Sequence, residues 1–108
     1  MKPSTRQRFV AMRFDYPAAA EEERIVANEA QVDARLAAQV VKLGQALRRL
    51  EQHDLEEVAS TRLLIFAARM IRSGMSPREA CLACLAEPLS DDPQTVAALM
   101  GVVDVHFG

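Results

Sequence analysis

Apolar side chains recur at helical spacing in five separate stretches of the chain. Each stretch is preceded by residue types that start helices, which are Pro17, Asp33, Ser60 or Thr61, Ser76 with Pro77, and Asp92 with Pro93. The pattern predicts helices over about 18–30, 33–50, 62–72, 77–87 and 93–107. The chain is therefore predicted to be mainly α, a compact bundle of four to five helices.

Two of these stretches carry further expectations. Residues 63–71 are apolar nearly all round, so the third helix is expected to be buried on most sides and to form the centre of the bundle. Gly74 is expected to close this helix. Pro88 is expected to end the fourth helix.

The N-terminal segment follows a different pattern. Val10, Met12, Phe14 and Tyr16 alternate with other residues at the period of a β-strand, and Pro17 ends the run. No second strand can be recognised downstream, and a lone strand leaves its ladder groups unpaired. This segment therefore either pairs with another chain or completes a sheet that lies outside the sequence.

Composition narrows the class of protein. The chain has 108 residues, 50% hydrophobic and 26% charged, which is typical of one globular domain. Its net charge of −2 gives no basic excess for nucleic acid, and no apolar run approaches the roughly 20 residues that insert in a membrane. Two cysteines form no disulfide framework, so we expect a cytoplasmic location.

The usual catalytic and metal-binding residues are sparse. Cys81 and Cys84 form a C-x-x-C pair on one helix face, but no further ligand lies at metal spacing, and burial in the core is favoured. His53 and His106 are isolated and are interpreted as surface or helix-end residues. Asp91-Asp92 is interpreted as a helix cap rather than a metal site.

Arginines provide the more informative signals. Arg62 lies in the first turn of a predicted helix, where a cation opposes the helix dipole. Either an anion such as phosphate resolves the conflict, or Arg62 pairs with Glu56 or Glu57 just upstream. Arg6 and Arg8 precede the predicted strand; such residues are ordinary surface residues in most proteins, but one subunit can also lend an arginine there to its neighbour's nucleotide.

Three motifs, in order, resemble one family. Residues 2–10 (KPSTRQRFV) with 14–17 (FDYP) look like the end of the AAA+ core in the CbbQ/NirQ/NorQ group of MoxR-type ATPases. Residues 59–64 (ASTRLL) resemble the second-sensor motif of the lid in that group. Residues 87–93 (EPLSDDP) are similar to a signature near the C-terminus of the CbbQ-type lid.

The resemblance implies a division of the chain and roles for its arginines. Residues 1–17 would be the end of an AAA+ core, including its last strand, and residues 18–108 the helical lid that closes over ATP. Arg8, with Arg6 as second candidate, matches the arginine finger that reaches the nucleotide of the neighbouring subunit. Arg62 matches the sensor-two arginine, which contacts the γ-phosphate in its own subunit. Cations around a transferring phosphoryl group accelerate the reaction.

The resemblance also implies partners that this sequence lacks. The phosphate loop and the acidic strand for Mg²⁺ are absent, so this chain alone is expected neither to hydrolyse ATP nor to bind ATP and Mg²⁺ tightly. Val58 also occupies a position where glycine is common in the lid motif.

The intact ATPase would form a homo-oligomeric ring, expected to be a hexamer, with a von Willebrand factor A-type adaptor. Its client would be Rubisco or a nitric oxide or nitrite reductase, and the sequence does not decide between them.

Two other interpretations remain open at this stage. The chain could be a free-standing helical interaction module. It could also be a DNA-binding protein, because residues 70–86 have helix-turn-helix proportions. The second helix of that unit carries only Arg78 as a base, which disfavours DNA binding.

Overall fold

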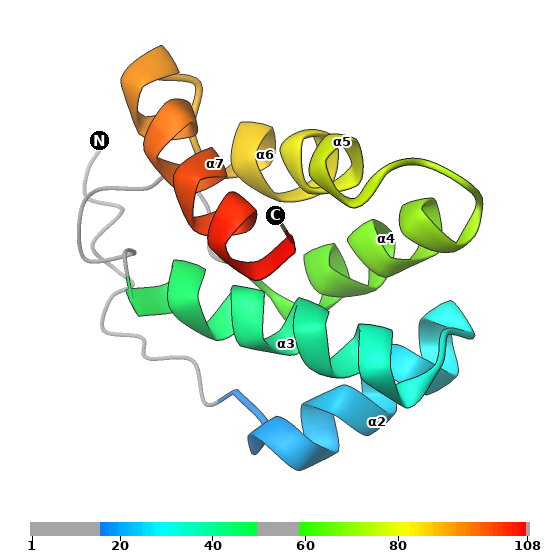
Figure 1. Ribbon diagram of the computed structural model, residues 1–108. Coiled ribbons are helices and arrows are strands. Elements are labelled where there is room, and N and C mark those ends of the chain that lie inside the picture. Colours follow the sequence, from blue (N-terminus) through cyan, green and yellow to red (C-terminus); the bar gives the residue numbers. More distant parts are fainter. Residues whose placement is uncertain (1–15, 50–58, 108) are drawn as a thin grey trace.

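A computed structural model describes residues 16–49 and 59–107, which form a helical bundle (Figure 1). Its elements are α2 (Ala19–Ala30), α3 (Ala34–Arg49), α4 (Thr61–Arg72), α5 (Pro77–Cys81), the π-helical turn η3 (Leu82–Ala86), α6 (Glu87–Leu89) and α7 (Pro93–Phe107). The predicted mainly α bundle is confirmed. The predicted strand, apart from its last residue Tyr16, lies outside the described residues, as do Arg6 and Arg8.

The helices pack around α3 and α4. A three-residue connection, with Gln31 in the left-handed conformation (φ 59°), joins α2 to α3, and α4 packs against both helices. On the other side of α4 lie α5 and η3, and α7 packs against both of them and returns to contact α3 (Figure 1). The first turn of α4 therefore lies close to residues from helices that precede it in the chain.

Side-chain caps begin four of the helices where the sequence predicted them. In each case a side-chain oxygen accepts a hydrogen bond from a backbone N–H two or three residues into the helix. The pairs are Leu36 to Asp33 (2.8 Å), Leu63 to Ser60 (3.3 Å), Glu79 to Ser76 (3.2 Å) and Thr95 to Asp92 (3.0 Å). The first helix differs, because its N-cap Ala18 offers no side-chain bond and Pro17 precedes the cap.

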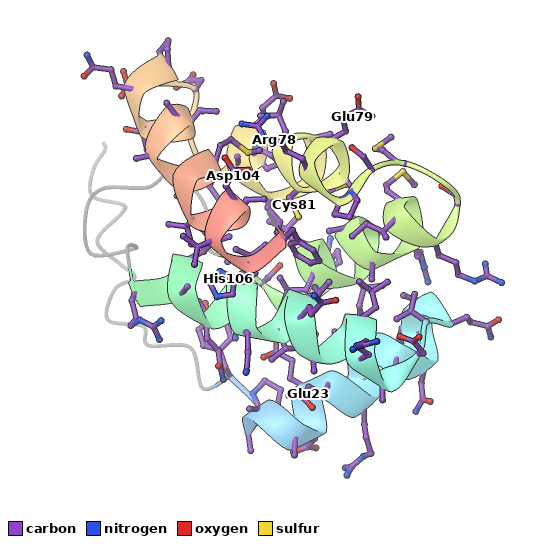
Figure 2. The ribbon with its side chains drawn as sticks, viewed as in Figure 1. Glu23, Arg78, Glu79, Cys81, Asp104 and His106 are labelled. Atoms are coloured by element: carbon purple, nitrogen blue, oxygen red, sulfur yellow. The ribbon has the colours of Figure 1, made fainter. Side chains whose placement is uncertain are left out.

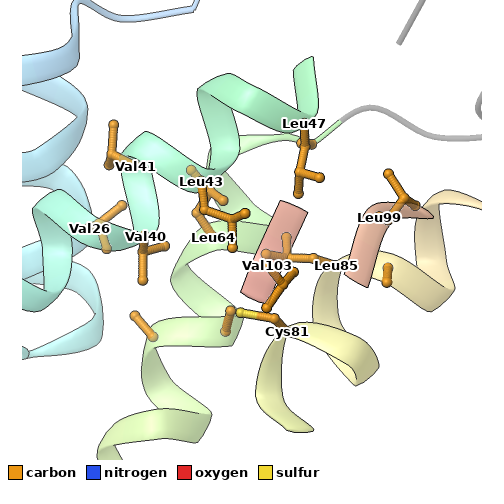
Figure 3. Packing of buried hydrophobic residues seen from close by; sticks show 14 of the residues in the cluster. Val26, Val40, Val41, Leu43, Leu47, Leu64, Cys81, Leu85, Leu99 and Val103 are labelled. Atoms are coloured by element: carbon orange, nitrogen blue, oxygen red, sulfur yellow. The ribbon is translucent and has the colours of Figure 1, made fainter. Parts of the chain in front are cut away.

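The core is built from aliphatic side chains of every long helix (Figure 3). Along α3 the apolar side chains at helical spacing face the core: Val40, Leu43 and Leu47 are fully buried, and Leu36 is partly buried against them. Leu64 of α4 and Val103 of α7 pack in the same cluster. Close packing of this kind supplies most of the stability of short helices.

The prediction that α4 is buried on most sides is wrong. Only one face of the helix, with Leu64, Ala67 and Ala68, is fully buried. Phe66 and Met70, one turn apart, remain 41% and 37% exposed. The cause is geometric: α4 has neighbours on two sides, α2 and α3 on one and α5 and η3 on the other, which leaves one face uncovered among the described residues.

The prediction that Pro88 ends the fourth helix is also wrong, because helical structure runs two residues past the predicted end at residue 87. Helical structure continues through Pro88 to Leu89. In an α-helix the proline ring would collide with the carbonyl four residues earlier. The preceding turn η3 is instead π-helical, and the N–H of Glu87 donates to the carbonyl of Leu82, five residues back. This wider turn accommodates Pro88 without ending the helix.

Within residues 16–49 and 59–107, no helix combines the length and the hydropathy needed to cross a membrane.

Substitution by alanine is expected to change stability in opposite directions at two helical glycines. A Cβ at Gly44, in α3, would lie 2.7 Å and 2.9 Å from the Cδ atoms of the fully buried Leu64. A Cβ at Gly101, in α7, would meet nothing within 4 Å. Overpacking costs about 1–3 kcal/mol, whereas replacing a helical glycine by alanine gains about 1 kcal/mol.

We therefore expect Gly44→Ala to lower the free energy of unfolding of this chain by about 1 kcal/mol. We expect Gly101→Ala to raise it by about 0.5–1 kcal/mol. Urea unfolding followed by circular dichroism measures both. Equal stabilisation by the two substitutions would contradict the close contact between α3 and α4.

Candidate functional site

The first turn of α4 presents Arg62 to solvent. Ser60 is the N-cap, in extended conformation (φ −74°, ψ 162°), so Thr61 and Arg62 are the first two residues of the helix. Arg62 is exposed and makes no hydrogen bond or ion pair with any described residue. Exposure to water lowers the cost of placing this cation near the positive end of the helix dipole. Glu56 and Glu57, its alternative partners, lie outside the described residues.

A buried ion pair lies directly beneath this turn. Glu22 of α2 is fully buried, and Arg48 of α3 has a side chain only 10% exposed. Their contact is bidentate: Nη1 of Arg48 donates to Oε1 of Glu22 (2.9 Å) and Nη2 donates to Oε2 (2.6 Å). Such paired charge-assisted bonds are among the strongest in proteins.

Both members of the ion pair also hold the start of α4. The hydroxyl of Thr61 donates to Oε2 of Glu22 (2.7 Å). Nε of Arg48 donates to the carbonyl oxygen of the fully buried Ala59 (2.8 Å). We call these four residues, Glu22, Arg48, Ala59 and Thr61, the α4 anchor. The anchor fixes the backbone on both sides of the N-cap.

Tyr16 extends this arrangement toward the N-terminal segment. The guanidinium carbon of Arg48 lies 3.6 Å from the centroid of the Tyr16 ring. A cation over an aromatic face is attracted by the ring's negative charge distribution. Because Tyr16 is the last residue of the predicted strand, Arg48 connects the end of that segment with the start of α4.

The anchor shifts the pKa of Glu22. Burial raises the pKa, because a charged carboxylate is disfavoured away from water. The hydrogen bonds from Arg48 and Thr61 and the positive charge of Arg48 act in the opposite direction and outweigh burial, so the pKa lies below the ordinary value of 4.5. Glu22 is therefore a carboxylate at neutral pH.

The local sequence around Glu22 gives no indication of this ion pair. Glu22 belongs to the acidic run 21–23 near the start of α2, where negative charge is ordinary because it favours the helix dipole. Its partner Arg48 is 26 residues away, and nothing in the local pattern of either helix pairs them. One feature of the sequence does indicate that Glu22 is buried: it lies four residues before Val26, which places both residues on the apolar face of α2.

The other candidates from the sequence keep structural roles. Cys81 is fully buried, and burial, with the neighbouring Cys84, raises the pKa of its thiol to about 12. Asp92 caps α7, as predicted. Nδ1 of His106 lies 3.0 Å from the carbonyl oxygen of Val102 in the same helix. The described residues contain no group of three potential metal ligands; His53 lies outside them.

Arg78, the one base in the second helix of the 70–86 unit, contacts a carboxylate. Its Nε lies 3.0 Å from Oδ1 of Asp104, which joins the start of α5 to α7 (Figure 2). Both side chains are well exposed, so the pair contributes little stability. This contact gives the DNA-binding interpretation no support.

The helical bundle that carries Arg62 matches a known class of C-terminal domain. The family model described as CbbQ/NirQ/NorQ C-terminal matches residues 22–106. The chain therefore belongs to this family, as the sequence motifs had indicated. The match includes the anchor and Arg62, and excludes the segment that contains Arg6 and Arg8.

Individual relatives agree with this assignment. The chain is 93% identical over 108 residues to a denitrification regulatory protein NirQ of Stutzerimonas stutzeri, covering all of the chain and 39% of that protein. It is 73% identical over 106 residues to the protein of the same name from Pseudomonas aeruginosa, covering 98% of the chain and 41% of that protein. A protein CbbQ of Hydrogenophilus thermoluteolus is 44% identical over 107 residues, with 99% and 40% covered. The chain thus spans about two fifths of the length of these relatives.

The depressed pKa of Glu22 predicts an acid-sensitive contribution to folding. Because the folded state holds this carboxylate at a lower pKa than the unfolded chain does, the unfolded state binds more protons as the pH falls. The stabilisation is present above the ordinary value of 4.5 and is lost as the pH falls through the lower pKa of the folded state.

Urea unfolding of the chain between pH 3 and pH 7 tests this expectation, with Glu22→Gln as reference. We expect the difference in free energy of unfolding between the two proteins to shrink toward acid pH. A difference that stays constant through this range would contradict the assigned ionisation of Glu22.

Proposed function

We propose that this chain is the lid of a AAA+ ATPase and that Arg62 is its sensor-two arginine. The observation that carries the proposal is the geometry at the start of α4: an exposed guanidinium, without a partner among the described residues, at the beginning of a helix held from beneath by a buried ion pair. Family membership supports it, and so does the match to only about two fifths of each relative's length, as expected for one domain of a larger protein.

The residues at this site suit a phosphate group. Arg62 offers planar, paired N–H donors, and the helix start adds the backbone N–H groups of Thr61 and Arg62 and the positive end of the dipole. We propose that Arg62 holds the terminal phosphate of ATP bound by the same subunit. ATP supplies the bond whose hydrolysis drives the protein's action, and Arg62 stabilises negative charge during that reaction.

The remaining parts of the machinery are proposed from the family resemblance. Arg8, or alternatively Arg6, serves as the arginine finger for a neighbouring subunit. The AAA+ core that holds ATP with Mg²⁺ belongs to the part of the relatives that this chain does not span. The complete protein forms a ring, proposed to be hexameric, in the cytoplasm and acts with a von Willebrand factor A-type adaptor.

The comparisons favour one client class. Identity is 93% and 73% with the two NirQ proteins, which are named denitrification regulatory proteins, and falls to 44% with the CbbQ protein and equally to 44% with a protein NorQ of Paracoccus denitrificans. We therefore propose that the complete protein activates or remodels an enzyme of denitrification, such as a nitric oxide or nitrite reductase, rather than Rubisco. In this action, closure of the lid over ATP is coupled to the change in the client.

The proposal predicts the effect of removing Arg62 from the complete protein. Arg62→Ala should lower ATP turnover about a hundredfold, because one charge-stabilising donor is lost. Arg72→Ala is the matched control, since Arg72 is also exposed and lies at the opposite end of α4. Steady-state phosphate release measures both, and wild-type turnover in the Arg62 variant would contradict the sensor role.

A further inference from the structure

The start of α4 is held differently from the starts of α3 and α7. In the described residues, α3 and α7 begin with local caps only, formed by Asp33 and Asp92. The start of α4 has its local cap, Ser60, and in addition receives contacts from two other helices through Glu22 and Arg48. This second set of contacts is more than a helix needs in order to begin.

These contacts converge on the residues around Arg62. Thr61, whose hydroxyl donates to Glu22, directly precedes Arg62. Ala59, whose carbonyl accepts from Arg48, lies three residues before it. Because one bidentate ion pair holds both points, the backbone from 59 to 61 cannot move without disturbing Glu22 and Arg48 together. The long side chain of Arg62 therefore extends from a fixed origin.

We infer that Thr61, Glu22 and Arg48 are positioning residues for Arg62. The inference rests on the sensor role proposed for Arg62 and adds the residues that fix the position of its side chain. Displacement of a charge-stabilising group by about 1 Å can cost up to a hundredfold in rate. Removing the hydroxyl of Thr61 is the most selective test of this inference, because it leaves the ion pair between Glu22 and Arg48 in place.

The chain provides a matched control for this substitution. Thr95 also donates its hydroxyl to a carboxylate at a helix start, from Oγ1 to Oδ2 of Asp92 (2.8 Å). This bond is exposed and local, and Asp92 belongs to the cap of the same helix. Thr61→Val and Thr95→Val therefore delete the same chemical group, once from the α4 anchor and once from an ordinary cap. Thr61→Ser keeps the hydroxyl and serves as the rescue variant.

The first experiment measures how firmly the anchor holds the first turn of α4, and it does not require ATP. In the 108-residue chain, hydrogen exchange of the Leu64 amide, which donates to the carbonyl of Ser60 (3.2 Å), reports the first turn of α4. We expect Thr61→Val to speed this exchange about tenfold and Thr61→Ser to restore it. Thr95→Val should leave it unchanged. Unaltered exchange in Thr61→Val would overturn the inference, whatever the role of Arg62.

The second experiment is a double-mutant cycle in the complete protein, read out as ATP turnover. Thr61→Val should lower kcat about tenfold, Thr61→Ser should retain most of it, and Thr95→Val should have no effect. In an Arg62→Ala background, Thr61→Val should cause no further loss, because there is no guanidinium left to position.

The outcomes separate the two proposals. If Arg62→Ala lowers kcat and Thr61→Val does not, the sensor role stands and positioning is overturned. If Thr61→Val costs the same factor with and without Arg62, the threonine acts on general structure and positioning is again overturned. If the protein with Arg62→Ala hydrolyses ATP at the wild-type rate, the proposed sensor role is contradicted, and the positioning inference is contradicted with it.

Discussion

The buried ion pair between Glu22 and Arg48 is the interaction on which the arrangement of the bundle's first half depends. A carboxylate that is fully removed from water is strongly destabilising unless its oxygens are paired. Here both oxygens accept from Arg48, and one accepts in addition from Thr61. Since the three residues come from three helices, the requirement to pair one charge fixes α2, α3 and the start of α4 relative to one another.

Apolar packing alone would leave that geometry less specific. The core consists largely of leucine, valine and alanine, which tolerate small shifts between helices. The close approach of α3 to α4 at Gly44 limits one direction of sliding, because Leu64 fills the space that a side chain would need. The ion pair adds directional bonds at the end of α4 where Arg62 lies. Stability thus comes mainly from the core, and the position of the proposed site comes mainly from the polar contacts.

Much of the fold could be predicted from the sequence because its determinants are local. Asp33, Ser60, Ser76 and Asp92 each cap a helix with their own side chain, so residue type and position were sufficient. The predictions were wrong where contacts or turns outside the local sequence pattern determine the structure. The exposure of Phe66 depends on which faces of α4 have neighbours, and the passage of the helix through Pro88 depends on a π-helical turn.

The candidate site divides in the same way. Arg62 was recognisable because a cation in a first helical turn breaks a local rule, and the structure confirms its place there. Glu22 and Arg48 were not recognisable as a pair, since 26 residues separate them and each has an ordinary local explanation. The finger roles of Arg6 and Arg8 stay predictions, because both residues lie outside the described part of the chain.

A thermodynamic double-mutant cycle on Glu22 and Arg48 tests the central claim most directly. The free energy of unfolding would be measured for Glu22→Gln, Arg48→Met and the double variant. We expect each single change to cost about 3–5 kcal/mol, because each disrupts a buried pair. The double variant should cost less than their sum by at least about 1 kcal/mol. Strictly additive losses, each below about 1 kcal/mol, would contradict the account.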